Sequence, residues 1–264
     1  MKIYLLGDIG EYNKMTNKII NNIKKDNSKK TILILGDNFY PDGISSINDI
    51  QWKNFKELNL DFSIWGILGN HDYLGNVKAQ IDYKESNWNI PNFYYKKSFE
   101  FIDIFFIDTS ILLPDFCNLN YNIIKSKLGK EPLQCSKEML EWLNKELKNC
   151  DKLKMVVGHY PISSFGVYGI NKRLFKILFP IFKKHNVKYY ISGHDHNLQI
   201  VDIYTIGYEM KQIISGGCSH LYPTLNSSNK VFSQFGTVMI DTKEHLINIL
   251  DDNLKLLYKE DIIY

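Results

Sequence analysis

Five short polar segments, each placed directly after an apolar stretch, constrain this chain more than any other feature. In chain order they are Gly7-Asp8-Ile9-Gly10, Gly36-Asp37-Asn38-Phe39-Tyr40, Gly69-Asn70-His71-Asp72, Val157-Gly158-His159 and Gly193-His194-Asp195-His196. Side chains that follow the carboxyl ends of neighbouring strands converge above one edge of an α/β sheet. A single Gly-Asp pair is a common turn, but five such segments predict one shared polar site.

The composition is that of a single globular domain. The chain has 264 residues, of which 44% are hydrophobic, and it is long enough to bury a core without disulfides or structural metals. Its 32 basic and 29 acidic residues nearly balance, so we expect no nucleic-acid partner, because such binding needs a clustered basic excess. We find no repeat, linker or low-complexity tract, and therefore predict one domain over residues 1–264.

Alternating apolar and amphipathic stretches predict the fold class. Continuous apolar runs, typical of strands buried on both faces, occupy residues 31–35, 62–68, 101–107, 153–157 and 187–191. Helical periodicity predicts helices at 12–25, 136–148 (capped by Ser136) and 174–184 (interrupted by Pro180). After residue 198, short strands at 199–206, 211–215, 234–241 and 245–251 predict a second, mostly antiparallel sheet. Together these elements predict a four-layer α/β/β/α sandwich.

The polar groups in the five segments are of the types that bind two metal ions. Asp8 and Asp37 each follow a buried strand, and since a carboxylate can bridge two cations, one of them should lie between two metals. The neutral donors are an amide and three imidazoles: Asn70, His159, His194 and His196. Each residue taken singly is more often structural than a ligand, and only their joint occurrence predicts the site. His185 and His245 lack such a context, and His220 stays unassigned.

Tyr40 is the most discriminating residue of the set. It lies three positions after Asp37, whereas Gly10 occupies the position where many two-metal phosphoesterases have a histidine. A phenolate is a hard anionic donor that suits a trivalent ion. Tyr40 therefore favours ferric iron over zinc or manganese at that position.

These segments, with their flanking residues, resemble the purple acid phosphatases of the small tartrate-resistant type. The resemblance covers nearly the whole chain and rests on residues 36–40, 69–77, 79–81, 88–91, 158–161 and 193–199. It implies a metallophosphoesterase that hydrolyses phosphate monoesters by attack of a metal-bound hydroxide. The implied cofactors are Fe(III) and a divalent metal, which is Fe(II), Zn(II) or Mn(II).

The resemblance also implies a role for each residue of the site. The implied ferric ligands are Asp8, Tyr40 and His196, the bridging ligand is Asp37, and the divalent ligands are Asn70, His159 and His194. His71, together with Asn70, would bind the phosphate, and His71 would protonate the leaving group while Asp72 orients its ring. The two metal ions would carry five positive charges, and Asp8, Asp37 and the Tyr40 phenolate would carry three negative ones. A net charge of about +2 would remain to bind the phosphate.

The chain departs from this family at three places. Tyr168 occupies a position where relatives carry a histidine, so we expect it to contact the phosphate. The family disulfide is expected to be absent, because the partner position of Cys117 holds Arg173; closure of a loop by Cys117 and Cys135 is the less favoured alternative. The family's glycosylation sequon is lost near Gly75, although residues 226–228 form another.

The strand-like start of the chain leaves no room for a secretory leader before Gly7. No apolar run approaches the length of a membrane helix. We therefore expect an intracellular monomer with no membrane partner.

Residues 112–135 form a long polar excursion with two open interpretations. Loops of such length are either functional or disordered, so this segment is a lid over the metals or a plain surface loop. Two alternatives to the main function also remain open: a phosphodiesterase or protein phosphatase on the same scaffold, and a catalytically weak binding or scaffold homologue. The second is disfavoured because no ligand is lost.

Overall fold

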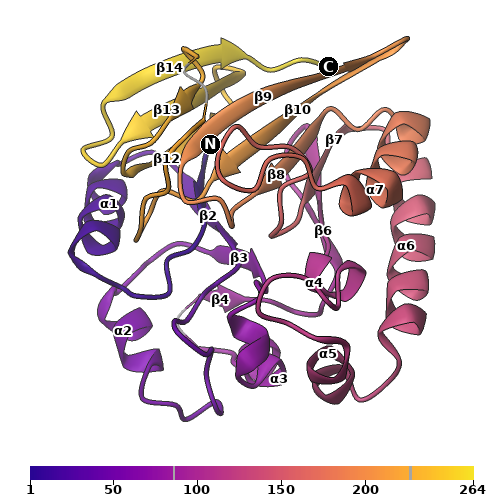
Figure 1. Ribbon diagram of the computed structural model, residues 1–264. Coiled ribbons are helices and arrows are strands. Elements are labelled where there is room, and N and C mark those ends of the chain that lie inside the picture. The colour runs from indigo at the N-terminus through magenta and orange to yellow at the C-terminus, as the bar shows by residue number, and fades with distance from the viewer. Residues whose placement is uncertain (86, 226–227) are drawn as a thin grey trace.

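The computed structural model describes residues 1–85, 87–225 and 228–264, so Asn226 and Ser227 of the sequon lie outside the described residues. Two seven-stranded sheets form its centre (Figure 1). The first has the order β14-β13-β12-β1-β2-β3-β4, with β1 (Lys2–Leu6), β2 (Lys30–Leu35), β3 (Ile64–Ile67), β4 (Trp88–Asn89), β12 (Gly236–Asp241), β13 (Leu246–Asp251) and β14 (Leu256–Asp261). The second has the order β11-β9-β10-β8-β7-β6-β5, with β5 (Tyr95–Ser98), β6 (Ile102–Phe106), β7 (Leu153–Val157), β8 (Tyr189–Ser192), β9 (Leu198–Thr205), β10 (Tyr208–Ser215) and β11 (Val231–Phe232).

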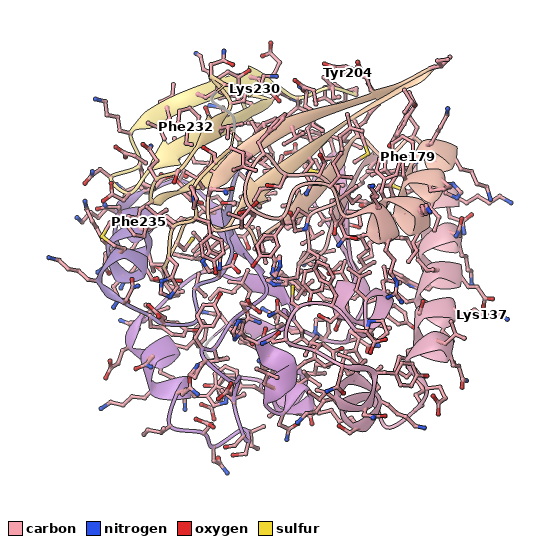
Figure 2. The ribbon with its side chains drawn as sticks, in the orientation of Figure 1. Lys137, Phe179, Tyr204, Lys230, Phe232 and Phe235 are labelled. Atoms are coloured by element: carbon pink, nitrogen blue, oxygen red, sulfur yellow. The ribbon has the colours of Figure 1, made fainter. Side chains whose placement is uncertain are left out.

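Helices cover the outer faces of both sheets, which confirms the four-layer sandwich. Figure 1 shows α1, α2 and α3 on the side of β1–β4 and α4 to α7 on the side of β6–β8. Their bounds are α1 (Lys14–Lys25), α2 (Trp52–Glu57), α3 (Val77–Asp82), α4 (Thr109–Leu112), α5 (Tyr121–Leu128), α6 (Pro132–Lys148) and α7 (Lys172–His185), with a 3₁₀ turn at Asp72–Leu74. Exposed side chains such as Lys137 of α6 point outward (Figure 2).

The strands are apolar on both faces because each face meets a different layer. In β1, Ile3 and Leu5 belong to the core between the two sheets, whereas Tyr4 and Leu6 belong to the core beneath the helices. The period of two along a strand sends alternate side chains to opposite faces. The continuous apolar runs in the sequence therefore indicated double-sided burial correctly.

The expected second sheet, made only of strands after residue 198, is wrong. Those strands divide between the two sheets: β10 pairs with β8, while β12 pairs with β1. Each parallel half-sheet would otherwise expose an unpaired edge, and the C-terminal strands cover one edge of each. The sequence pattern identifies a strand but does not specify its neighbours.

One expected helix boundary and one expected interruption are also wrong. Helix α6 begins at Pro132 rather than near Ser136, because proline fits the first helical position, where no backbone donor is needed. Helix α7 continues through Pro180, and its buried face, which includes Phe179 and Phe182, holds it against the sheet. The ring of Phe179 also lies against that of Tyr208 of β10, with the two centroids 5.7 Å apart.

The excursion at 112–135 is largely ordered rather than a structureless loop. Helix α5 occupies its middle, capped by Asn120, whose Oδ1 accepts from the backbone N–H of Ile123 at 3.0 Å. In the described part of the chain, all four cysteines are free thiols, so the loop-closing alternative is not realised. No helix in that part has the length and apolar character needed to cross a bilayer.

Candidate metal centre

The backbone itself is unusual at three of the expected ligands. Asp8, Asp37 and His194 have φ angles of 59°, 53° and 65°, and each lies two residues after the end of a strand. Left-handed backbone at a residue other than glycine costs on the order of 1–3 kcal/mol and is concentrated at functional sites. These three sharp turns bring side chains from β1, β2 and β8 to one place.

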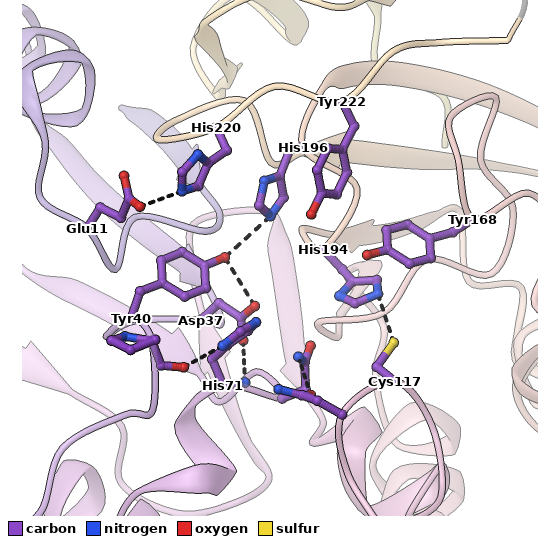
Figure 3. Close-up of a pocket in the computed structure, with 13 residues that line it drawn as sticks. Glu11, Asp37, Tyr40, His71, Cys117, Tyr168, His194, His196, His220 and Tyr222 are labelled. Atoms are coloured by element: carbon purple, nitrogen blue, oxygen red, sulfur yellow. Dashed lines mark hydrogen bonds and ion pairs between the residues drawn. The ribbon is translucent and has the colours of Figure 1, made fainter.

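The first group of donor atoms gathers around the hydroxyl of Tyr40. Its oxygen lies 3.3 Å from Asp8 Oδ1, 3.2 Å from Asp37 Oδ2 and 3.3 Å from His196 Nε2 (Figure 3). His196 Nε2 is in turn 3.4 Å from Asp8 Oδ1. Four side chains from three distant segments thus present oxygen and nitrogen atoms to one point.

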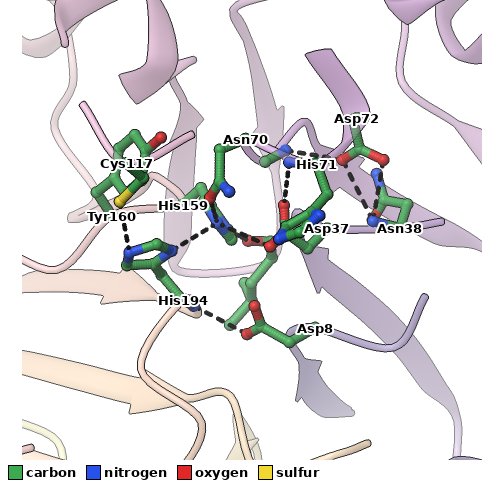
Figure 4. Close-up of polar contacts among 12 residues, drawn as sticks. Asp8, Asp37, Asn38, Asn70, His71, Asp72, Cys117, His159, Tyr160 and His194 are labelled. Atoms are coloured by element: carbon green, nitrogen blue, oxygen red, sulfur yellow. Dashed lines mark hydrogen bonds and ion pairs between the residues drawn. The ribbon is translucent and has the colours of Figure 1, made fainter. Parts of the chain in front are cut away.

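The second group gathers around the buried ring of His159. Its Nε2 atom lies 3.0 Å from Asn70 Oδ1, 3.2 Å from His194 Nδ1 and 3.5 Å from Asp37 Oδ2 (Figure 4). Donor atoms of Asp37, His159 and His194 all lie within 4.8 Å of one another. Asp37 Oδ2 therefore belongs to both groups of donor atoms.

The hydrogen-bond geometry of the second group calls for a positive charge at its centre. His159 Nδ1 lies 2.8 Å from the carbonyl oxygen of Leu35, so this nitrogen must carry a proton and donate it. In the neutral ring, Nε2 then presents a lone pair toward the oxygens of Asn70 and Asp37, and acceptors face acceptors. A positive charge removes this conflict, and it can be either a second proton on His159 Nε2 or a cation bound between these groups.

The pKa shifts in the site also indicate that a positive charge belongs among these donor atoms. Burial lowers the pKa of His159, but the Asp37 carboxylate outweighs it and raises the pKa to about 9. Burial also raises the pKa of Tyr40, and the carboxylates of Asp37 and Asp8 raise it further. A phenolate at Tyr40 can therefore form only when a cation offsets both carboxylates. The Nδ1 atom of His196 is buried without a hydrogen-bond partner among the described residues.

Asn118 fixes the direction of the Asn70 amide. The Nδ2 atom of Asn70 donates to Asn118 Oδ1 at 2.8 Å, which turns the amide oxygen toward His159. Asn118 lies in the excursion between α4 and α5, just after Cys117, whose sulfur is 3.4 Å from His194 Nε2. The excursion therefore reaches the site, and its role as a lid stays a prediction.

Asp72 does not orient the ring of His71, and that expectation is wrong. Its carboxylate instead accepts from the backbone N–H groups of Gly69 at 2.8 Å and Asn38 at 3.1 Å, and from Gln80 Nε2 at 2.8 Å (Figure 4). Burial, followed by the charge of Asp37, raises the pKa of Asp72 to about 6. Asp72 therefore ties the turn after β3 to the turn after β2.

The ring of His71 is held by a backbone carbonyl instead. Its Nδ1 lies 2.5 Å from the carbonyl oxygen of Pro41, so Nδ1 carries a proton and Nε2 remains available to the pocket. The backbone N–H of His71 donates to Asp37 Oδ1 at 2.9 Å. His71 thus holds the candidate ligand Asp37 through its backbone N–H, and its side chain places an imidazole ring at the pocket.

Gly69 is needed for the close approach of Asp37. A Cβ atom at Gly69 would lie 2.2 Å from Asp37 Oδ1, which no side chain tolerates. This explains why the segment that carries Asn70 and His71 begins with glycine.

Five of the seven candidate ligands (Asp37, Tyr40, Asn70, His194 and His196) line a pocket of about 460 Å³, and the other two, Asp8 and His159, are fully buried. Tyr168, assigned from the sequence, lines this pocket with its ring 4.2 Å from that of His194. Sequence reasoning missed several other lining residues: Glu11, Pro41, Cys117, Asn118 and Tyr222, together with His220, which was left unassigned. No motif surrounds them, and only the fold brings them to the pocket.

Comparison with known proteins identifies the family of this chain. The calcineurin-like phosphoesterase family matches residues 1–198. Human tartrate-resistant acid phosphatase type 5 is 32% identical over 260 residues, which cover 86% of this chain and 77% of that protein.

Two solved structures share the fold. GAP50, described as the anchor in the inner membrane complex of Plasmodium, superposes with a TM-score of 0.79 at 22% identity, covering 99% of this chain and 88% of its own. Purple acid phosphatase PPD1 from yellow lupin seeds gives a TM-score of 0.66 at 14% identity, covering 98% of this chain and 53% of its own. At these identities the likeness shows the fold alone.

Proposed function

Because this chain belongs to the calcineurin-like phosphoesterase family and is similar over most of its length to a tartrate-resistant acid phosphatase, we propose that it is a binuclear-metal acid phosphatase acting on phosphate monoesters. The observation that carries this proposal is the position of Asp37 Oδ2, 3.2 Å from Tyr40 Oη in one donor group and 3.5 Å from His159 Nε2 in the other. A single carboxylate oxygen shared by two donor groups is what a two-metal site requires.

The residues present fit the proposed metals. Asp8, Tyr40 and His196 would hold Fe(III), since this group contains the phenol and a carboxylate, which are hard donors. Asn70, His159 and His194 offer neutral donors, which suit a divalent ion. When bound, the two cations would lower the pKa of a coordinated water and neutralise charge on the phosphate.

The chain's own residues would position the ester and move protons. His71 lines the pocket, and because its Nδ1 is bonded to Pro41, its Nε2 would be the atom that gives a proton to the departing alkoxide. The hydroxyl of Tyr168 is the proposed contact for phosphate on the side of His194. Among the described residues that line the pocket none is Lys or Arg, so the anion would depend on the metal charges, which supports metal dependence.

The scaffold alternative receives support only from the fold. GAP50 is described as an anchor, and its likeness in fold does not transfer that role. The complete donor set and the free Nε2 of His71 support catalysis instead.

The first prediction tests the metals through Tyr40. The purified protein is expected to contain about two metals per chain, including iron, to be coloured by phenolate-to-iron charge transfer, and to hydrolyse an aryl phosphate at acidic pH. Tyr40→Phe should lose the visible band while the fold, measured by circular dichroism, is kept. A colourless, active protein with two zinc ions, unaffected by Tyr40→Phe, would contradict the proposed pair of metals.

The second prediction concerns Asn118. Because its side chain orients the amide of Asn70, Asn118→Ala should weaken divalent-ion binding by roughly 10- to 100-fold, the usual cost of losing a partner that orients a metal ligand. Competition with a chromophoric chelator measures this affinity. Asn122→Ala, an exposed change in α5 of the same excursion, is the matched control and should bind as the wild type does. Equal affinities for all three proteins would show that Asn118 does not position the ligand.

A further inference from the structure

Two loops beside the pocket are poor in charged residues. Residues 160–171 and 212–229 contain no Asp, Glu, Lys or Arg, although these four types make up 23% of the chain. The first loop supplies Tyr168 to the pocket and the second supplies Tyr222. Figure 3 shows these two tyrosines on one side of the pocket and Tyr40 and Glu11 on the other.

The same loops expose apolar side chains, and two of them, Val167 and Leu221, are next in sequence to the pocket residues Tyr168 and Tyr222. The exposed fractions are 37% for Phe165, 47% for Val167, 63% for Ile170, 36% for Leu221 and 72% for Leu225. We call these five residues the apolar collar. Single exposed apolar residues are ordinary, but a gathering of them on adjoining loops marks a binding surface.

Hydrogen bonds connect the two loops of the collar to each other and to the segment that carries His194 and His196. The backbone N–H of Leu225 donates to the carbonyl of Phe165 at 2.7 Å, which joins the two loops. The N–H of Tyr222 donates to the carbonyl of His196 at 2.8 Å, and Ser164 Oγ donates to Asp195 Oδ2. A surface fixed in this way loses little conformational entropy when a ligand covers it.

The chemistry of the collar restricts what covers it. Its backbone donors at Phe165, Gly166 and Leu225 are already used, by Gln199 Oε1 at 2.8 Å, Ser164 Oγ at 2.8 Å and the Phe165 carbonyl respectively. These three N–H groups are therefore not available to a ligand, and the two loops offer a charged leaving group no Asp, Glu, Lys or Arg side chain. The second loop also contributes His220 to the pocket, and its Nε2 atom pairs with Glu11 Oε1 at 2.6 Å.

We propose that the natural substrate is a phosphate monoester whose leaving group carries an uncharged hydrocarbon tail, and that this tail lies on the apolar collar while the phosphate lies over the donor groups. This inference rests on the proposed phosphatase function and names its substrate class. The tail would gain free energy from removing apolar surface from water, both its own and that of the collar.

The test is a series of n-alkyl phosphates with three to ten carbons, all below their micelle-forming concentrations. Their leaving alcohols are nearly equal in acidity, so differences in kcat/KM report contact with the tail. Full burial of a methylene corresponds to about fourfold, and a tail covered on one side is expected to gain about twofold per methylene. Val167→Ser combined with Leu225→Ser should flatten this dependence, whereas Ile206→Ser, a 97% exposed residue in the β9–β10 turn, should preserve it.

Hydrolysis of nitrophenyl phosphate, measured in parallel, distinguishes a wrong substrate class from a wrong proposed function. If the metal-loaded protein hydrolyses nitrophenyl phosphate but shows no chain-length dependence, the substrate class is wrong and the phosphatase function stands. If no ester is hydrolysed, the proposed function itself is wrong. A chain-length dependence that survives in the double variant would overturn the role of the collar. A wild-type protein that sediments as a dimer and a double variant that sediments as a monomer would also overturn it, because the collar would then be an interface between copies of this chain.

Discussion

Replacing His71 by alanine is expected to lower kcat on alkyl phosphates by roughly a hundredfold to ten-thousandfold, the range of general acid catalysis. The kcat on nitrophenyl phosphate should fall much less, because nitrophenolate is a good leaving group that departs without being protonated. The expected difference follows from the ring geometry: Pro41 holds Nδ1 at 2.5 Å, and Nε2 is free in the pocket to deliver a proton. A residue that merely shaped the pocket would affect both esters equally.

The His71 variant should keep its metals. The residue contacts Asp37 through its backbone N–H, at 2.9 Å, and alanine preserves that hydrogen bond. Metal content and kcat on the two esters are the measurements, and His245→Ala, an exposed histidine in the β12–β13 turn, is the control that should change neither. Loss of metal would show that His71 supports the metal centre, and equal loss on both esters would show that it binds phosphate rather than donating a proton.

The strands could be predicted from sequence, but their arrangement could not. The run Thr31–Leu35 is apolar on both faces because it lies between two layers, and this signal is local. The choice of β1 as the neighbour of β12 is not local, since it depends on which edge is left to cover. Helix α5 was missed because its polar residues, among them Lys125 and Lys127, are those of a solvated loop as much as of an exposed helix.

The candidate ligands could be predicted because each sits in a short motif, and the structure brings all seven together. The residues around them had no such signal. Asn118 acts only through Asn70, and Tyr222 stacks on His196 with ring centroids 4.4 Å apart. Asp72 also lies within a motif, but its position next to His71 in the sequence wrongly suggested that it orients the His71 ring. Sequence spacing specifies which groups gather, whereas hydrogen-bond partners depend on the direction of each side chain.

Asp37→Asn is expected to have the largest effect of any single substitution. The change keeps the shape of the side chain and the Oδ1 acceptor for the His71 N–H. It replaces Oδ2, the atom shared by both donor groups, with an amide that donates protons toward the place of the cations. Both groups lose one negative charge, so both metals should bind more weakly.

Activity should fall by at least about a thousandfold, because the metals supply several kcal/mol of transition-state stabilisation and each 1.4 kcal/mol is a factor of ten. Metal content and kcat are measured together. Asp42→Asn removes an exposed carboxylate from the same loop without touching either group and should retain both metals and full turnover. If Asp37→Asn instead loses only one metal, the carboxylate serves a single ion. If it keeps two metals and turns over normally, the two-metal proposal has no bridging ligand at this position and is wrong.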